Sequence, residues 1–226
     1  MDKPDSAIVD LRVVVTRDSS KTLALGNSRI TYRSMNGAVT ESRHVFIGCG
    51  LKPVLGQRQL RILEIGFGTG LNALLTLIEA GETNITYEAI EPYPLTAPQW
   101  KVLDYGEHLG ETSVGFFQRM HSAPWNEQVA ITSRFHLLKS QTSIQGAVLS
   151  GPFHIIYFDP FDPEFQPALW TQEVFAKLFA VTSPGGRLVT YSSKGIVRRA
   201  MEAAGYIVER VPGPPGKRHV TVAVRN

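Results

Sequence analysis

Three glycines at alternate positions are the most distinctive chemical feature of the sequence. Gly66, Gly68 and Gly70 follow a short apolar run and precede a stretch of helical composition. Glycines here let the backbone turn tightly from a strand into a helix and let a ligand approach the main chain. The spacing departs from the dinucleotide fingerprint G-x-G-x-x-G, because Leu71 stands where the third glycine should be, and this disfavours a nicotinamide or flavin site. The sequence has no G-x-x-x-x-G-K-[ST] run, which argues against a P-loop.

Two acidic residues frame this glycine loop. Glu64 lies two residues before Gly66, and Glu91 lies 21 residues after Gly70, at the end of the next apolar run. In open α/β sheets, ligands bind at the carboxyl ends of the strands, and an acid at about this separation can accept both hydroxyls of a ribose. The loop and its acids therefore predict a nucleoside site; a plain strand-to-helix turn is the alternative.

A third acid follows another apolar run. Residues 155–158 are followed by Asp159-Pro160-Phe161-Asp162-Pro163. Pro160 cannot continue a strand ladder and keeps Asp159 extended. We therefore expect Asp159 at the carboxyl edge of the sheet, near the glycine loop, where an acceptor of a transferred group would lie. The alternative is a turn cap, and turn chemistry is the role favoured for Asp162.

The elements that must position these acids alternate between strands and helices. Such alternation predicts an α/β fold with a parallel sheet covered on both faces. Strands are expected over 60–65, 85–90, 134–138, 153–158, 187–191, 206–211 and 219–224, and helices over 71–80, 100–109, 114–120, 171–180 and 196–204. The proline-glycine link 212–216 predicts an antiparallel hairpin at one edge, and 183–186 predicts a turn.

The first 55 residues differ from the rest of the chain. Residues 8–16 and 22–25 have strand composition and flank the turn cluster Asp18-Ser19-Ser20, so a hairpin is predicted. Residues 41–49 are expected to be helical. These features divide the chain into a β-rich N-terminal extension, residues 1–55, and a main domain, residues 56–226.

Composition excludes several protein classes. The 226 residues are 43% apolar and 19% charged, which excludes disordered, collagen-like and coiled-coil chains. No apolar run approaches the roughly 20 residues that span a bilayer, and the start of the chain lacks the layout of a signal peptide. The single cysteine, Cys49, indicates a reducing compartment, so a cytoplasmic location is expected. Six scattered histidines show no metal-ligand spacing.

Positive charge is concentrated in the last part of the sequence. Residues 187–226 hold eight lysines and arginines against two glutamates, although the whole chain carries only +3. A basic end of this kind can hold a polyanion. A solvated surface without a partner is the alternative.

Several segments, taken together, resemble one family. They are Tyr32-Arg33-Ser34, Glu41–Phe46, Glu64–Asn72, Tyr157–Phe161 with Leu169-Trp170, Val189–Gly195, Val197–Arg199 and Pro212–Arg218. The glycine loop and its acids are similar to the cofactor site of class I S-adenosylmethionine-dependent methyltransferases. The whole set resembles the tRNA (5-methylaminomethyl-2-thiouridine) methyltransferase family, in its stand-alone form without the flavin oxidase half, over most of residues 18–222.

This resemblance implies both a fold and a reaction. The fold would be Rossmann-like, with a mostly parallel seven-stranded sheet. The reaction would be transfer of a methyl group from S-adenosylmethionine to the 5-aminomethyl group of 5-aminomethyl-(2-thio)uridine at the tRNA wobble position. The product would be 5-methylaminomethyl-(2-thio)uridine, and neither a metal nor a membrane would take part.

The resemblance also implies roles for individual residues. The cofactor would contact Tyr32, Ser42, Glu64, Gly66, Phe67, Gly68, Gly70, Asn72, Glu91 and Asp159. Asp159 would be the central catalytic residue, with Glu41 beside it. The anticodon loop would meet Phe161, Lys194, Lys217 and Arg218. Many class I enzymes bind the adenine amine with an acid that is absent from Leu138–Thr142, where Ser140 or Gln141 could replace it.

Alternatives to this function remain open at the level of sequence. A methyltransferase for a small amine or a protein would need the same cofactor site without the basic end. An aminopropyl transferase would use a decarboxylated cofactor on the same fold. A non-catalytic RNA-binding module is disfavoured by the joint presence of Glu64, Glu91 and Asp159. Phe161, Tyr191 and Trp170 are candidates for stacking a base, with core packing as the favoured single role of each.

Overall fold

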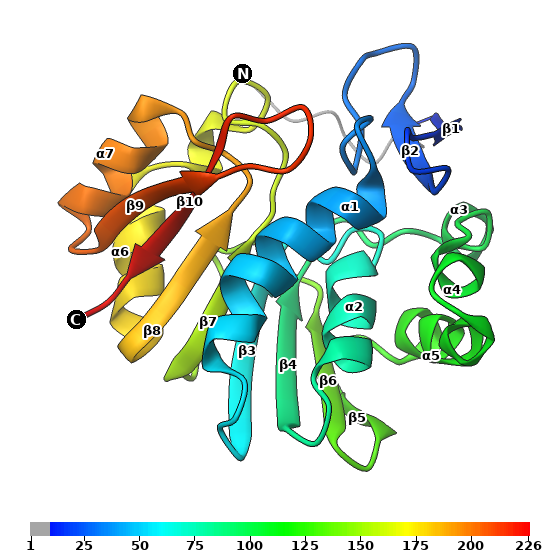
Figure 1. Ribbon diagram of the computed structural model, residues 1–226, viewed down its shortest axis with the longest axis horizontal. Coiled ribbons are helices and arrows are strands. Elements are labelled where there is room, and N and C mark those ends of the chain that lie inside the picture. Colours follow the sequence, from blue (N-terminus) through cyan, green and yellow to red (C-terminus); the bar gives the residue numbers. More distant parts are fainter. Residues whose placement is uncertain (1–9) are drawn as a thin grey trace.

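An eight-stranded sheet forms the centre of the molecule in a computed structural model that describes residues 10–226 (Figure 1). The strands lie in the order β5-β6-β4-β3-β7-β8-β10-β9. Their bounds are β3 Gln59–Ile65, β4 Asn84–Ile90, β5 Gln128–Thr132, β6 Phe135–Ser140, β7 Phe153–Phe158, β8 Thr182–Thr190, β9 Ile207–Pro212 and β10 His219–Val224. β6, β4, β3, β7 and β8 pair in parallel. β10 lies between β8 and β9 and is antiparallel to both, which confirms the predicted hairpin.

The order of the strands creates a crevice beside the central strand β3. From β3 the chain continues to β4 and β6 on one side, and it returns later to place β7 and β8 on the other. Ile65 at the end of β3 is paired with Phe158 at the end of β7. Because ligands of open α/β sheets bind where the strand order reverses, this topology places the glycine loop and Asp159 at the same edge.

Helices cover both faces of the sheet, and each face has its own core. One face carries α1 (Ala38–Ser42), η1 (Arg43–Leu51), α2 (Leu71–Glu79) and α5 (Glu111–Ser122). The other face carries α6 (Gln172–Val181) and α7 (Gly195–Ala203). The remaining helices have only three or four residues each: η2 (Lys52–Val54), α3 (Ala97–Trp100), α4 (Tyr105–His108) and η3 (Pro167–Leu169). No helix in residues 10–226 combines the length and the apolar character that a membrane crossing needs.

The N-terminal segment contributes a hairpin and a helix. β1 (Leu11–Val15) and β2 (Lys21–Leu25) pair antiparallel, as predicted, while residues 8 and 9 of the expected strand lie outside the described residues. α1 continues directly into the π-helical segment η1, which buries Val45, Phe46 and Ile47 in the core of the main sheet. The boundary at residue 55 stays a prediction.

Three sequence predictions differ from the structure in detail. The sheet has one strand more than the seven implied, because β5 adds a hairpin partner to β6. The expected turn 183–186 lies inside β8, where the pairing with β7 shifts register. The expected helix 100–109 is two short helices, α3 and α4; α3 begins early because the Gln99 Oε1 accepts the Thr96 N–H at 2.8 Å.

Candidate functional site

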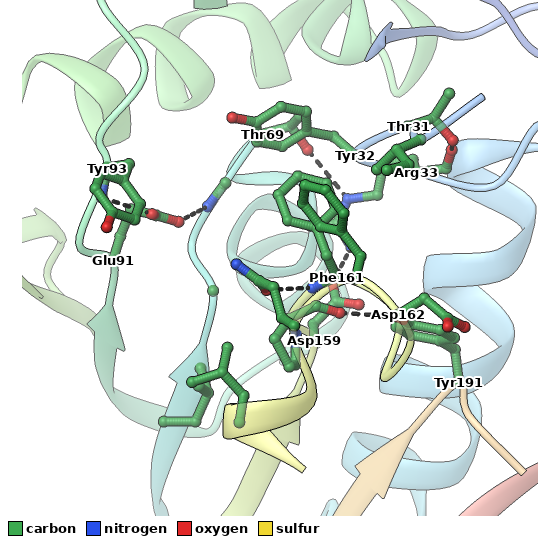
Figure 2. A pocket seen from close by; sticks show the side chains of 18 of the residues that line it. Thr31, Tyr32, Arg33, Thr69, Glu91, Tyr93, Asp159, Phe161, Asp162 and Tyr191 are labelled. Carbon is green, nitrogen blue, oxygen red and sulfur yellow. Dashed lines mark hydrogen bonds and ion pairs between the residues drawn. The ribbon is translucent and has the colours of Figure 1, made fainter. Parts of the chain in front are cut away.

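The carboxyl ends of β3, β4 and β7 open into one cleft of about 390 Å³, a volume typical of small-molecule sites. Figure 2 shows Glu91 and Tyr93 on one side of it and Asp159, Asp162 and Tyr191 on the other. The predicted site residues that line the cleft are Tyr32, Glu41, Gly66, Gly68, Glu91, Asp159, Phe161 and Lys217. The sheet and the N-terminal segment therefore build this cleft together.

The glycine loop has the backbone that its sequence predicts. Gly66, Gly68 and Gly70 have φ angles of +92°, +48° and +71°, a region that favours glycine. A Cβ on Gly66 would lie 2.9 Å from the main-chain oxygen of Asp159. Glycine at position 66 therefore lets the ends of β3 and β7 approach each other, and α2 begins directly after Gly70.

Glu91 is held in place by main-chain donors. One of its carboxylate oxygens accepts the Gly68 N–H at 3.0 Å, and the other accepts the Tyr93 N–H at 2.9 Å. Burial raises the pKa of Glu91 to about 7, although these two hydrogen bonds lower it. Each oxygen has a second lone pair, so the carboxylate can still accept two hydroxyls from a ligand in the cleft.

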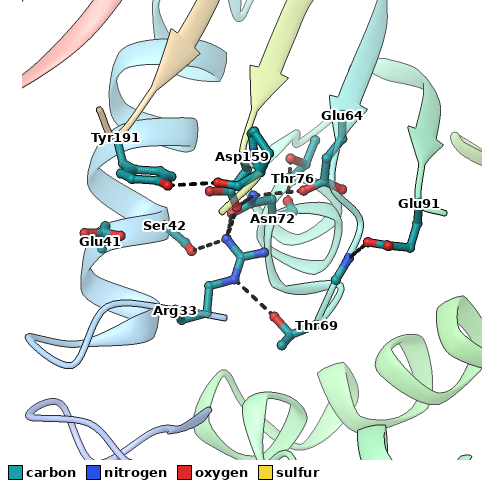
Figure 3. A network of polar contacts seen from close by, with 12 residues as sticks. Arg33, Glu41, Ser42, Glu64, Thr69, Asn72, Thr76, Glu91, Asp159 and Tyr191 are labelled. Carbon is teal, nitrogen blue, oxygen red and sulfur yellow. Dashed lines mark hydrogen bonds and ion pairs between the residues drawn. The ribbon is translucent and has the colours of Figure 1, made fainter. Parts of the chain in front are cut away.

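A buried arginine at the wall of the cleft forms the centre of a polar network (Figure 3). The Arg33 Nη1 pairs with the Asp159 Oδ2 and donates to the Asn72 Oδ1 at 3.2 Å and the Ser42 Oγ at 3.4 Å. The Arg33 Nε donates to the Thr69 Oγ1 at 3.1 Å. One guanidinium therefore connects the N-terminal segment to the glycine loop, α2 and the end of β7.

Asn72 links the two acids of the network. Its Nδ2 donates to the Glu64 Oε1 at 2.8 Å and to the Asp159 Oδ2 at 2.9 Å. Burial raises the pKa of Glu64 to about 8 and that of Asp159 to about 6, while Arg33 lowers both. The Glu64 Oε2 is buried and has no hydrogen-bond partner among residues 10–226. At neutral pH the Glu64 carboxyl is therefore mostly protonated, and the Arg33 guanidinium balances the negative charge of Asp159.

Aromatic side chains form the other wall of the cleft. The rings of Tyr32 and Phe161 meet edge to face, with centroids 5.0 Å apart. The Tyr191 hydroxyl donates to the Pro160 oxygen at 2.8 Å, and the Trp170 Nε1 donates to the Phe161 oxygen at 2.9 Å. Trp170 is only 4% exposed, which confirms the prediction that it packs in the core. Phe161 and Tyr191 line the cleft.

The basic residues predicted to contact RNA have different surroundings. The Lys217 ammonium pairs with the Glu41 Oε2 at 2.8 Å and lies over the Tyr191 ring. The Lys194 ammonium pairs with Asp162 at 2.7 Å and with Glu164 at 2.8 Å. Asp162 lines the cleft, whereas Lys194 does not. Arg218 is exposed and forms no ion pair within the described part of the chain.

Several predicted residues lie behind the cleft instead of lining it. Ser42, Glu64 and Asn72 belong to the Arg33 network, and Gly70 ends the glycine loop. Phe67 is buried against the rings of His121 and Trp125. No residue of Leu138–Thr142, the region expected to contact adenine, lines the cleft; Ser143 and Ile144, which follow it directly, do.

Arg33 is the important residue that sequence reasoning did not assign. It stands in one of the segments that carry the family resemblance, but a lone arginine in a loop gives no sign that it will be buried. Its partners Thr69 and Asn72 lie 36 and 39 positions away. Among residues 10–226, no group of three or more histidine, cysteine or acidic side chains is arranged to hold a metal ion.

Comparison with known proteins relates this chain to methyltransferases. Residues 126–226 match a family model described as S-adenosyl-L-methionine-dependent methyltransferase. The tRNA 5-methylaminomethyl-2-thiouridine biosynthesis bifunctional protein MnmC of Cupriavidus metallidurans is 30% identical over 210 residues, which is 85% of this chain. The protein of the same name from Caulobacter sp. is 30% identical over 80% of the chain. The chain is a relative of these bifunctional proteins.

The relationship confirms the predicted resemblance and leaves a difference in length. The chain spans about a third of the length of these curated relatives, with 31% and 33% of each covered. Among solved structures, MnmC2 from Aquifex aeolicus matches 97% of this chain and 72% of its own, with 24% identity and a TM-score of 0.75. Spermidine synthase from Thermotoga maritima matches 97% of this chain and 70% of its own, with 15% identity and a TM-score of 0.59. These two similarities confirm the class I methyltransferase fold.

The Arg33 network predicts a large effect on the stability of this MnmC relative. Arg33→Met keeps much of the side-chain volume but leaves Asp159 and Glu64 buried without the positive charge. We expect a loss of about 3–5 kcal/mol in the free energy of unfolding at pH 7.5, measured by urea denaturation. Arg29→Met, at an exposed arginine of the same segment, should cost less than about 0.5 kcal/mol. Equal losses in the two variants would show that the buried Arg33 contributes no more to stability than an exposed arginine.

The burial of Glu64 should make the free energy of unfolding depend on pH. Its pKa is raised from 4.5 to about 8 by burial, so folding favours its protonated form. The stability that it contributes is complete below pH 4.5 and is lost as the pH rises to about 8. Relative to the unmodified protein, Glu64→Gln should gain on the order of 3 kcal/mol in unfolding free energy between pH 4.5 and pH 8. Glu127→Gln, at an exposed glutamate, is the control: its unfolding free energy should differ from that of the unmodified protein by the same amount at every pH. The same pH-independent difference for Glu64→Gln would contradict the raised pKa of Glu64.

Proposed function

We propose that the protein transfers a methyl group from S-adenosylmethionine to the 5-aminomethyl group of 5-aminomethyl-(2-thio)uridine at the tRNA wobble position. The observation that carries this proposal is the position of Asp159 beside the glycine loop, at the edge of a cleft with an aromatic wall. Arg33 and Asn72 both bind its Oδ2. Its Oδ1 makes no hydrogen bond within residues 10–226, which suits contact with an acceptor. The sequence relationship to the bifunctional MnmC proteins supports the choice of acceptor.

The residues of the cleft fit the proposed donor. Glu91 would accept the ribose hydroxyls, and Gly66 and Gly68 leave room for the nucleoside against the main chain. When bound, S-adenosylmethionine supplies a methyl group already activated by a positive sulfur.

Asp159 would position the acceptor amine. Its pKa of about 6 keeps it largely ionised at neutral pH, so its free oxygen accepts an N–H of the amine and aims the nitrogen lone pair. A carboxylate also favours the ammonium form of the amine, and burial of the site opposes that effect. The amine nitrogen would form the new bond to the methyl carbon while the carbon–sulfur bond of the donor breaks and its electron pair goes to the sulfur, which leaves neutral. The nitrogen would then release a proton, which Asp159 is suited to receive. Alignment of this kind contributes up to roughly 7–11 kcal/mol.

The same cleft would take the target base from a single-stranded loop. A wobble uridine leaves the anticodon stack at low cost, and aromatic side chains stack exposed bases. Phe161 and Tyr191 supply such rings beside Asp159, and Lys217 lies over the Tyr191 ring. The tRNA anticodon loop is therefore the proposed partner.

The N-terminal extension completes the proposed site. Tyr32, Arg33 and Glu41 reach the cleft or its supporting network from residues 1–55, while residues 56–226 supply the sheet. The proposed location is the cytoplasm, where a chain with the single thiol of Cys49 would stay reduced.

Removal of the Asp159 charge should separate catalysis from donor binding. Asp159→Asn keeps the side-chain size but reduces the ability to accept an amine proton. We expect methyl transfer to fall at least about 100-fold. The dissociation constant for S-adenosylmethionine, measured by calorimetry, should change less than about fivefold. The activity assay is mass spectrometry of wobble nucleosides after incubation of undermodified tRNA with protein and donor.

The same assay distinguishes the other candidate functions. Methylation of a free amine or a protein in place of tRNA would identify a different acceptor. Preference for the decarboxylated donor would identify an aminopropyl transferase. RNA binding without any transfer by the unmodified protein would identify a binding module. Full activity of Asp159→Asn would remove Asp159 from the mechanism.

Arg218 predicts a salt-dependent contact with RNA phosphate. The tRNA affinity of the protein should fall as salt rises, and Arg218→Glu should weaken binding about tenfold and reduce the salt slope by about one. Arg58→Glu is the matched control, because Arg58 is an exposed arginine before β3, at the opposite edge of the sheet. Equal effects of the two reversals, or an affinity that does not depend on salt, would place the RNA elsewhere.

A further inference from the structure

An exposed phenylalanine stands at the mouth of the cleft. Phe165 is 48% exposed and lines the same cleft as Asp159. Its ring meets the Phe161 ring edge to face, with centroids 5.7 Å apart, and the Phe161 ring in turn meets Tyr32. Three aromatic rings therefore lead from the glycine loop to solvent, and Phe165 is the outermost.

The loop that carries Phe165 is held by contacts that do not involve its ring. The Phe165 N–H donates to the Asp162 oxygen at 2.8 Å, and the Glu164 N–H donates to the Asp162 Oδ1 at 2.9 Å. The Phe161 N–H donates to the Gln166 Oε1 at 3.0 Å. Because these bonds hold the main chain in place, a ligand that contacts the Phe165 ring does not have to order the loop.

We propose that Phe165 stacks the nucleobase next to the target uridine, as a separate subsite for a second base of the RNA. This inference rests on the proposed function. The target base would lie against Phe161 inside the cleft, so the next ring outward meets a neighbouring nucleotide of the strand. Aromatic platforms bind bases of single strands without regard to sequence, since every base has a π-face.

The charges around Phe165 favour a base over a phosphate. Lys194 pairs with both Asp162 and Glu164, and these three side chains together carry one negative charge. A phosphate would be repelled there, whereas a neutral base would not. The phosphates of the strand are instead expected at Arg218, which forms no ion pair within the described residues.

A double-mutant cycle between protein and RNA tests this subsite. The protein variants are Phe165→Ala, Phe165→Trp and the control Ile207→Ala, an apolar residue of 57% exposure on β9. The RNAs are labelled anticodon stem-loops, either intact or abasic at the nucleotide 5′ or 3′ to the target uridine. Fluorescence anisotropy gives the RNA dissociation constant, methyl transfer gives kcat and KM, and calorimetry gives donor affinity.

We expect Phe165→Ala to weaken binding of the intact RNA about tenfold and to raise KM by a similar factor. Phe165→Trp and Ile207→Ala should stay within about twofold of the unmodified protein. One of the two abasic RNAs should bind the unmodified protein about tenfold more weakly, and it should bind Phe165→Ala with no further loss. Donor affinity and kcat should not change.

Two results would overturn the subsite while leaving the proposed function intact. One is normal RNA affinity of Phe165→Ala in a protein that methylates tRNA. The other is full additivity of the Phe165→Ala loss with both abasic losses. Absence of methyl transfer by the unmodified protein would instead reject the proposed function and, with it, this inference.

Discussion

Placing carboxyl groups in a dry pocket requires a compensating positive charge, and Arg33 supplies it. Asp159 is 8% and Arg33 5% exposed in their side chains, so solvent screens neither. Burial alone would keep both Asp159 and Glu64 protonated at neutral pH, and the guanidinium shifts that balance toward the charged form. The Asn72 amide connects the two acids, since its Nδ2 donates a hydrogen bond to each of them. The chemistry proposed for Asp159 thus depends on a residue that does not belong to the sheet.

The fold supplies the remaining constraints through its topology. The glycine loop, the Glu91 strand end and the Asp159 strand end all lie at one edge, because β3, β4 and β7 are neighbouring parallel strands. The close approach at Gly66 fixes the distance between two of these strand ends. The N-terminal segment then covers the open side, with Tyr32 packed against Phe161. Donor and acceptor sides of the cleft are therefore built from different parts of the chain.

Much of this arrangement could be predicted from the sequence because it is local. Apolar runs ending at Ile65 and at Phe158, the first followed by glycine and the second by Asp-Pro, identify strand ends and the acids beside them. The two cofactor-side acids and Asp159 follow from that pattern. The short helices before α5 and the extra strand β5 could not be predicted, because their periodicity is weak and tertiary packing decides them. The ion pairs of Lys194 and Lys217 could not be predicted either, since no spacing rule indicates which acid a lysine will contact.

The ion pair between Arg33 and Asp159 joins positions 126 residues apart. Closing a loop of this length costs chain entropy, which the packing of the N-terminal segment against the sheet must offset. A partly folded chain with its sheet assembled would still expose Asp159 to water and would titrate it as an ordinary aspartate. The perturbed acidity of Asp159 therefore reports that the N-terminal segment is packed against the sheet.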